Sequence, residues 1–223
     1  MKTLYLFDID GTLVNINDIH LNAYKAAYKK ICNQLVPDEI ILRHFGMAEQ
    51  EQQEAIFKIM NMPKERIPKL IREYVKNMKD LTTKTKITSL PGVIECLSAL
   101  KKDKCNVLGI VTGNTEDMMH RILKSAGLHD FFSQFNGDDG NVQSRIDILK
   151  NAVRNLKPAP DKIIVIGDTQ SDINAGKVVG AITIGITTGS NSKTDLETAH
   201  QNFVIRNLSE LKILEKDLNR AKK

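Results

Sequence analysis

The chain opens on a short apolar run, Lys2-Thr3-Leu4-Tyr5-Leu6-Phe7, which changes abruptly into Asp8-Ile9-Asp10-Gly11-Thr12-Leu13-Val14. The run is too short for an ordinary helix and rich in strand-forming residues, so it predicts a buried β-strand. Gly11 indicates a sharp turn directly after that strand, because glycine adopts backbone conformations that other residues avoid. We therefore expect Asp8 and Asp10 at the carboxyl end of a buried strand.

Two carboxylates in such a position are costly to bury unless positive charge lies beside them. Mg²⁺ is the natural candidate, because it prefers oxygen ligands and takes few of them from the protein. An EF-hand calcium loop does not fit, because it needs glycine at position six and glutamate at position twelve. Counted from Asp8, those positions hold Leu13 and Ile19. A plain turn stays open as the alternative for this stretch taken alone.

Length and composition indicate an ordinary globular protein. The 223 residues suffice for one large domain, or for one domain with a smaller insert. Hydrophobic residues make up 41% and charged residues 26% of the chain, which is not the composition of a disordered protein. The formal net charge is +5, but the basic residues are scattered and aromatics are only 5%, so nucleic acid is not an expected partner.

The cysteines and the amino terminus bear on the cellular compartment. Cys32, Cys96 and Cys105 form no CxxC pair and leave one cysteine over, which suits a reducing compartment. The first apolar run is too short for a signal peptide, and no apolar stretch approaches membrane-spanning length. We expect a soluble cytoplasmic protein with no membrane partner.

The chain has two regions with different patterns of apolar residues. From 15 to 86 apolar residues recur at helical spacing and nothing alternates like a strand, which predicts a compact helical module. Beyond it, strands are expected to alternate with helices, which indicates a parallel sheet covered on both faces. The expected strands are 106–111, 132–136, 162–166, 181–186 and 203–205. The expected helices are 93–100 with Pro91 in its first turn, 115–126 closed by Gly127, 144–155 capped by Ser144, one after the 162–166 strand, and one from Ser209.

Polar residues that could bind a ligand or take part in catalysis follow three of the expected strands. Ligands of open parallel sheets bind at the carboxyl ends of the strands. The three sets are Asp8 with Asp10, Thr112 with Asn114, and Asp168 with Asp172.

Taken together, these motifs resemble those of the haloacid dehalogenase superfamily of aspartate-nucleophile phosphohydrolases, in the branch related to phosphoglycolate phosphatase and β-phosphoglucomutase. The matching stretches are Phe7–Val14, Leu90-Pro91-Gly92-Val93, Val111-Thr112-Gly113-Asn114, and Gly167-Asp168-Thr169 with Asp172. The resemblance implies a doubly wound, Rossmann-like α/β core formed by 1–14 and 87–223, with 15–86 as an inserted helical cap.

The third motif of that family departs from its usual form in this chain. The family generally has a lysine on a helix before the last motif strand. The best-aligned basic residue here is Arg145, whose forked guanidinium suits bidentate contact with phosphate oxygens. Lys150 and Lys157 are the alternatives, and for each of them an exposed helix position is the preferred interpretation.

The resemblance also implies roles in catalysis. Asp8 would attack phosphorus and form an aspartyl-phosphate, while Asp10 would protonate the leaving oxygen and later activate water. Mg²⁺ would be held by the carboxylates of Asp8 and Asp168 and by the main-chain carbonyl of Asp10. The groups expected to balance charge on the transferring phosphoryl group are Thr112, Arg145 and backbone amides near Ile9 and Gly113.

Three assignments near the site stay open. Asp172 either orients the metal site from outside its ligand shell or stabilises a helix amino terminus. Asn114 either contacts phosphate or caps the following helix. Asp138 or Asp139 could be an outer ligand, although a solvated loop fits them better.

The helical insert suggests the kind of substrate. An insert after the first motif is expected to act as a lid, which excludes water from phosphoryl transfer. Candidate contacts are Arg43, His44, Phe45, Gly46 and Met47, with an ordinary interhelical turn as the alternative. A small cap suggests a small phosphate monoester as substrate, with the protein a monomer or homodimer.

The expected function is therefore an Mg²⁺-dependent phosphomonoesterase, close to phosphoglycolate phosphatase. The alternatives are a sugar phosphomutase on the same scaffold and a non-catalytic regulatory relative. Dehalogenation is disfavoured, because that chemistry needs neither Asp10 nor a metal-binding Asp168.

Overall fold

The computed structural model describes residues 2–45, 47, 49–138, 144–154 and 156–220. The chain divides into two compact units. The core unit comprises Met1–Asn15 and Thr88–Lys223, and the helical unit comprises Ile16–Ile87. Within the described ranges, no helix is both long and apolar enough to span a membrane.

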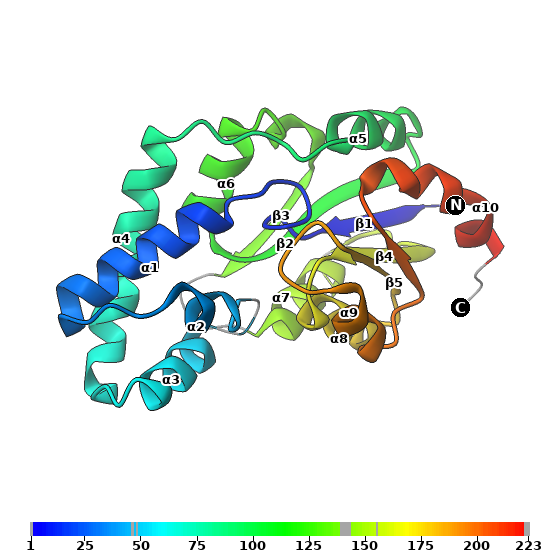
Figure 1. Cartoon of the computed structure of the whole chain (residues 1–223). Helices are drawn as coiled ribbons and strands as arrows, with labels where there is room; N and C mark the ends of the chain where they lie inside the picture. Colours follow the sequence, from blue (N-terminus) through cyan, green and yellow to red (C-terminus); the bar gives the residue numbers. More distant parts are fainter. Residues whose placement is uncertain (1, 46, 48, 139–143, 155, 221–223) are drawn as a thin grey trace. The chain divides into compact units, whose positions relative to one another are not determined.

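The core unit is built on a six-stranded sheet in which every neighbouring pair is parallel. The order across the sheet is β3-β2-β1-β4-β5-β6 (Figure 1). Phe7, the last residue of β1, lies between Ile110 and Ile166, so the carboxyl ends of three central strands meet at one end of the sheet. The strands are β1 Thr3–Phe7, β2 Asn106–Thr115, β3 Gln134–Asp138, β4 Lys162–Gly167, β5 Ile182–Ile186 and β6 Phe203–Ile205.

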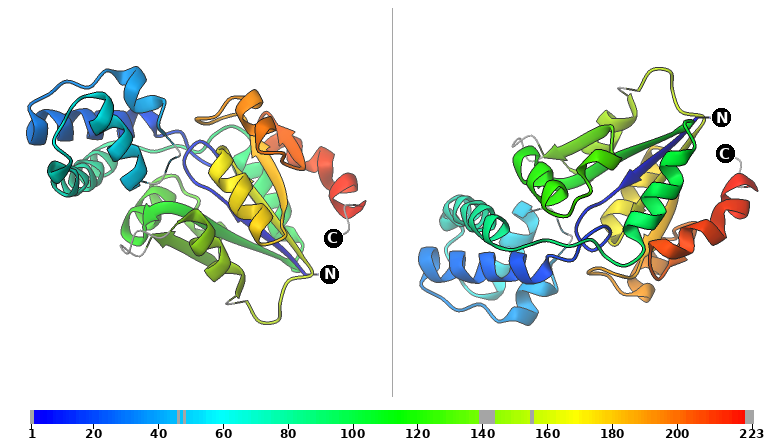
Figure 2. Two further views of the ribbon diagram at one scale, coloured as in Figure 1. Left: turned by 90° about the horizontal axis from the view of Figure 1, so that it is seen from below. Right: turned by 90° about the horizontal axis from the view of Figure 1, so that it is seen from above.

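Helices cover both faces of the sheet (Figures 1 and 2). One face carries α5 Val93–Lys102, α6 Glu116–Ser125 and α10 Leu211–Arg220, and the other carries α7 Arg145–Arg154, α8 Gln170–Val178 and α9 Lys193–Thr198.

Successive side chains of β1 point alternately toward the two helix layers, as they do on any β-strand. Leu4 and Leu6 pack in one cluster with Leu149 and Ala175, while Phe7 meets the ring of Phe132 edge-on. A strand that is buried on both faces has a nearly continuous run of apolar residues, as β1 does. The doubly wound parallel fold predicted from the sequence is confirmed.

Several element boundaries differ from the predicted ones. β2 continues to Thr115 instead of stopping at Val111, with an irregular register between these two residues. Pro91 is not in the first helical turn, because Gly92 at φ 79° is the residue preceding α5. The chain enters α10 through a 3-10 turn, Leu208–Glu210. α9 was not predicted, although Ser192 and Asp195 form a capping box at its start.

The helical unit is formed by α1 Asn17–Cys32, α2 Asp38–Leu42, α3 Glu49–Ile59 and α4 Ile67–Lys84, with a 3-10 turn at Lys64–Arg66. Its core is rich in aromatic side chains. Tyr28 and Phe57 are fully buried, and the rings of Tyr24 and Tyr74 stack with their centroids 3.9 Å apart. Such aromatic pairs add to the free energy gained by burying apolar surface.

Candidate active site

Asp8 lies directly after β1, at the end of the sheet where β2 and β4 also end. Its backbone N–H donates to the Ile166 carbonyl at 3.0 Å, which extends the pairing of β1 with β4 by one residue. The residue is only 5% exposed. Gly11 follows at φ 80°, so the sharp turn predicted after the strand is present. A Cβ on Gly11 would lie 2.5 Å from Asp168 Oδ2, so this turn is packed against the end of β4.

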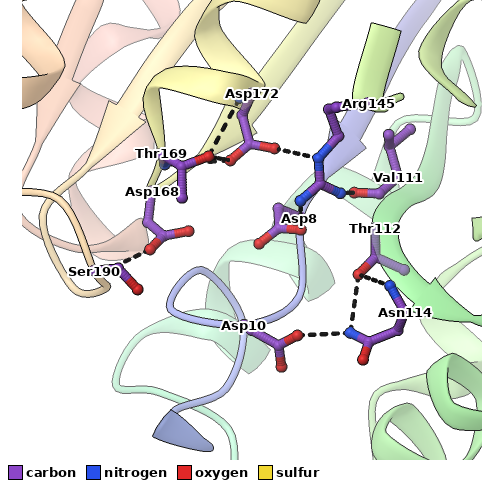
Figure 3. Close-up of polar contacts among 10 residues, drawn as sticks. All are labelled: Asp8, Asp10, Val111, Thr112, Asn114, Arg145, Asp168, Thr169, Asp172 and Ser190. Atoms are coloured by element: carbon purple, nitrogen blue, oxygen red, sulfur yellow. Dashed lines mark hydrogen bonds and ion pairs between the residues drawn. The ribbon is translucent and has the colours of Figure 1, made fainter. Parts of the chain in front are cut away.

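Asp10 is held by the end of β2 (Figure 3). Asn114 Nδ2 donates to Asp10 Oδ2 at 2.6 Å and to Thr112 Oγ1 at 3.0 Å. Thr112 is buried. Thr115, not Asn114, occupies the N-cap position of α6, so the capping alternative left open for Asn114 is wrong, and a contact of Asn114 with phosphate stays a prediction. Asn114 instead joins the first two motifs and orients the Asp10 carboxylate.

Arg145, the first residue of α7, contacts three different groups with its three guanidinium nitrogens (Figure 3). Nη2 lies 3.1 Å from Asp8 Oδ1, Nε lies 3.0 Å from Asp172 Oδ1, and Nη1 donates to the Val111 carbonyl at 3.0 Å. The side chain is 17% exposed. A planar fork with several donors can make such a set of contacts, whereas a single ammonium group cannot.

Asp172 caps the start of α8, which is one of the two roles that the sequence left open, while its orienting role at a metal site stays a prediction. Its Oδ2 accepts from the Thr169 backbone N–H and hydroxyl, which completes a capping box at the start of α8. Its other oxygen pairs with Arg145. A Cβ on Gly167 would lie 2.4 Å from the Asp172 side chain, so the backbone of β4 passes very close to this carboxylate. The cap of α8 thereby fixes one partner of the arginine.

Asp168 is enclosed by the loop that follows β5. The Ser190 backbone N–H donates to Asp168 Oδ2 at 2.6 Å, and a Cβ on Gly189 would lie 1.9 Å from the same oxygen. The Thr188 hydroxyl donates to the Gly11 carbonyl at 2.6 Å. Sequence reasoning treated this segment only as a loop. Its position after β5 was the available signal, because ligands of such sheets gather where strands end.

The pKa values of Asp8 and Asp168 are raised above the usual aspartate value. Burial raises the pKa of Asp8 well above its usual value, Arg145 opposes that rise, and Asp172 and Asp168 add to it. Burial, followed by the charge of Asp172, raises the pKa of Asp168 to about 7. Burial lowers the pKa of the Arg145 guanidinium, but Asp172 and Asp8 outweigh it and hold the pKa above the usual arginine value. Arginine therefore stays charged.

The donor set fits a hard divalent cation. Within the described residues, Asp8, Asp168 and Asp172 each offer one oxygen, and these atoms lie within 4.8 Å of one another. Asp168 Oδ1 is buried and has no hydrogen-bond partner among the described groups. A buried carboxylate oxygen without a donor is costly, and a cation would satisfy it. The Asp10 carbonyl, also expected as a ligand, stays a prediction.

The other residues that the sequence suggested for the site differ in their exposure to solvent. Lys150 is exposed on α7, as preferred for it, whereas Lys157 is exposed but lies after the end of that helix. Ile9 is buried and its carbonyl accepts from the Leu13 and Val14 N–H groups, whereas Gly113 is exposed. Phosphate contacts from their backbones stay predictions. Asp138 ends β3, while Asp139 lies outside the described residues.

The candidates in the helical unit follow α2. His44 Nδ1 lies 2.7 Å from the Ile40 carbonyl, and Phe45 packs against the His20 and Tyr24 rings. Arg43 and Met47 are exposed, and Gly46 lies outside the described residues. These contacts belong to the interior of the helical unit, and a role of this segment in substrate binding stays a prediction.

Comparison with known proteins gives a consistent result. The family model described as "Haloacid dehalogenase-like hydrolase" matches residues 5–186. A Clostridium perfringens relative bearing the PpaX name is 32% identical over 184 residues, which is 81% of this chain and 82% of the relative. Pyrophosphatase PpaX of Listeria innocua is 28% identical over 220 residues, with 96% and 97% covered.

Solved structures show the same fold. A hydrolase from Pseudomonas syringae superposes with a TM-score of 0.80 at 24% identity, covering 100% of both chains. A haloacid dehalogenase-like family hydrolase from Streptococcus pneumoniae gives a TM-score of 0.81 at 21% identity, covering 97% of this chain and 98% of its own. With its buried aspartates at the ends of β1 and β4, the chain belongs to the haloacid dehalogenase-like hydrolase family.

Proposed function

We propose that the protein is an Mg²⁺-dependent hydrolase of small phosphorylated metabolites that works through an aspartyl-phosphate on Asp8. The observation that carries this proposal is the contact of Arg145 with Asp8 and Asp172, beside the buried Asp168. A permanent cation next to a buried carboxylate favours its ionised form, which is the nucleophilic one. The same cation is suited to receive the charge of an incoming phosphoryl group.

The chemistry divides between the two aspartates at the end of β1. The Asp8 carboxylate oxygen forms a bond to phosphorus as the bond to the leaving oxygen breaks. Asp10 gives its proton to that leaving oxygen and then takes one from the water that cleaves the aspartyl-phosphate. Asn114, which donates to Asp10 Oδ2 at 2.6 Å, orients the Asp10 carboxyl group for both transfers.

Other groups position and balance the transferring phosphoryl. Arg145 contacts Asp8, and the buried Thr112 lies on β2, the strand next to β1. Asp8 and Asp168 are the carboxylates proposed to hold Mg²⁺, together with the Asp10 carbonyl, while Asp172 acts on the site through Arg145. When bound, Mg²⁺ supplies positive charge that reduces the repulsion between nucleophile and phosphate.

Inorganic pyrophosphate joins phosphate monoesters such as phosphoglycolate as a candidate substrate. The support is the name of the Listeria innocua relative, a pyrophosphatase 28% identical to this chain. Both substrate types present a terminal phosphoryl group to Asp8 and differ only in the leaving group. A sugar phosphomutase remains the alternative on this scaffold. A cytoplasmic location is proposed because the buried Cys32 and the exposed Cys105 form no disulfide.

The test is phosphate release from p-nitrophenyl phosphate, phosphoglycolate and pyrophosphate, with and without Mg²⁺, by wild type and Asp8→Asn. Removing the nucleophile should abolish Mg²⁺-dependent release, with the far-ultraviolet circular dichroism unchanged. Asp147→Asn is the matched control, because Asp147 is exposed at the start of α7. Equal release by wild type and Asp8→Asn would refute the proposal. Release from none of the three substrates, with conversion of a sugar monophosphate that requires the bisphosphate, would favour the mutase.

A further inference from the structure

Two histidines lie side by side in the core unit, and neither is among the residues assigned to phosphoryl transfer. His120 comes from the middle of α6, and His129 opens the 3-10 turn His129–Phe131. His120 Nδ1 lies 2.9 Å from His129 Nε2. The side chains are 30% and 27% exposed, so the pair is partly sheltered yet reachable from solvent.

An aromatic platform holds both rings in place. Phe135 of β3 lies 4.7 Å from the His120 ring and 4.8 Å from the His129 ring, measured between centroids. The His129 ring is stacked on Phe135 with an interplanar angle of 18°. Each imidazole is therefore restrained by packing as well as by its neighbour, which reduces the entropy lost when a ligand orders the pair.

A carboxylate lies behind the outer nitrogen of each ring. Glu116 Oε1 is 3.8 Å from His120 Nε2, and Asp130 Oδ1 is 3.5 Å from His129 Nδ1. The four side chains thus form a row in which the inner ring nitrogens face each other and the outer ones face acids. Histidines that bind metals commonly carry such a carboxylate behind the ring, because it fixes the tautomer and raises ligand basicity.

We propose that His120 and His129 form a two-histidine site for a divalent late transition-metal ion such as Ni²⁺. Metal–nitrogen bonds of about 2.0–2.1 Å at a right angle separate the two nitrogens by about 2.8–3.0 Å. The observed 2.9 Å matches two adjacent positions of an octahedral or square-planar ion. Water completes the coordination. Imidazole nitrogens suit Ni²⁺, Cu²⁺ and Zn²⁺, whereas Mg²⁺ prefers the oxygens of the aspartate cluster.

Metal binding at this pair requires a change of tautomer and a turn of the rings, because in the hydrogen-bonded pair the two inner nitrogens point at each other, with the ring centroids 5.1 Å apart. Without metal, one inner nitrogen donates its proton to the other, which accepts it through its lone pair. A metal needs both inner lone pairs, so the donating ring must carry its proton on the outer nitrogen instead. On His129 that nitrogen lies 3.5 Å from Asp130 Oδ1, which can accept the new N–H. On His120 it lies 3.8 Å from Glu116 Oε1, so the exposed Glu116 side chain must move closer to accept it. The proton stays on the same ring system and the net charge of the protein is unchanged.

The experiment measures Ni²⁺ binding to the full chain by titration calorimetry, in excess Mg²⁺ to occupy the aspartate cluster. Wild type is compared with His120→Gln and His129→Gln. His200→Asn is the matched control, because His200 is exposed and asparagine tolerates its positive φ of 52°. Paramagnetic Ni²⁺ also broadens the amide NMR signals of nearby residues, which locates the bound ion independently of any variant.

We expect one Ni²⁺ per chain, with affinity reduced at least about tenfold in each of the two glutamine variants and unchanged in His200→Asn. The broadened signals should centre on α6 and the His129–Phe131 turn. The proposal is overturned if well-folded wild type binds no Ni²⁺, if both glutamine variants bind as wild type does, or if the broadening centres elsewhere. Phosphatase activity should be the same in all four proteins, because none of these histidines touches the aspartate cluster.

Discussion

Arg145 is the residue whose replacement tests the site most directly. Two substitutions separate its charge from its shape. Arg145→Met removes the guanidinium and all three of its contacts, to Asp8, Asp172 and the Val111 carbonyl. Arg145→Lys keeps one positive charge, but a single ammonium group cannot reach the three acceptors that the fork reaches.

The expected size of the effect follows from burial. Arg145→Met leaves the carboxylates of Asp8 and Asp172 buried without their cation, and breaking a buried ion pair costs about 3–5 kcal/mol of stability. Both carboxylates are nearly inaccessible to solvent, so water cannot replace the lost partner. Arg145→Lys should cost about 1.5–3 kcal/mol of stability, the value of one hydrogen bond to a charged group. Activity should fall about 100- to 1000-fold in the methionine variant, because transition-state charge is no longer balanced.

Urea unfolding in EDTA at about pH 8 and about pH 5 measures the stability difference, and pyrophosphate or phosphomonoester hydrolysis measures activity. The deficit of Arg145→Met should shrink at the lower pH. Loss of the arginine raises the pKa of Asp8 further, so a falling pH protonates the unpaired carboxyl group and relieves it. Arg154→Met is the matched control, because Arg154 is exposed on the same helix.

The reasoning is refuted if Arg145→Met and Arg154→Met unfold at the same urea concentration and hydrolyse substrate equally well. A stability deficit that grows as the pH falls would refute the electrostatic part alone. Full activity in Arg145→Lys would mean that charge matters and the fork does not.

Two further predictions concern Asp168. Gly189→Ala should lower the free energy of unfolding by about 1–3 kcal/mol and lower activity, because the new Cβ would lie 1.9 Å from Asp168 Oδ2. Gly113→Ala is the control, because its Cβ would meet nothing within 4 Å, and it should be as stable as wild type in the same urea titration. The pKa of Asp168 is raised to about 7 in the folded protein. In EDTA, ionised Asp168 therefore lowers the stability of the native state above that pH. This destabilisation disappears as the pH falls from about 7 toward the lower pKa of Asp168 in the unfolded chain. Thermal unfolding should therefore show a larger stabilisation by Mg²⁺ at about pH 8 than at about pH 5. Asp168→Asn should remove most of that difference. An Mg²⁺ effect of the same size at both pH values in wild type would contradict the prediction.

The sequence alone predicted the parts of the fold that local patterns control. The apolar run ending at Phe7, followed by Asp8, Asp10 and Gly11, indicated a buried strand and a sharp turn, because side-chain alternation and glycine conformation act over a few residues. The alternation of strands and helices indicated a parallel sheet, because parallel neighbours require a crossover. The sequence also singled out Arg145 as the basic residue of the site.

Element ends were less predictable. β2 continues to Thr115 because the end of this strand pairs again with Asp138 after an irregular stretch. The sequence suggested that Thr112-Gly113-Asn114 would end the strand, but pairing with a neighbouring strand outweighed that local preference. α9 was missed because six residues show little helical periodicity, although its capping box was visible at Ser192.

Only the tertiary structure decided which side chains meet. Asn114 reaches Asp10 across 104 positions of the chain, and the loop carrying Ser190 reaches Asp168 across 22. His120 and His129 come together because the turn after α6 brings the second ring back beside the first. Strand register and loop path set such meetings, and both depend on packing between distant segments. Sequence periodicity reports which face a residue occupies, but not which residue lies opposite.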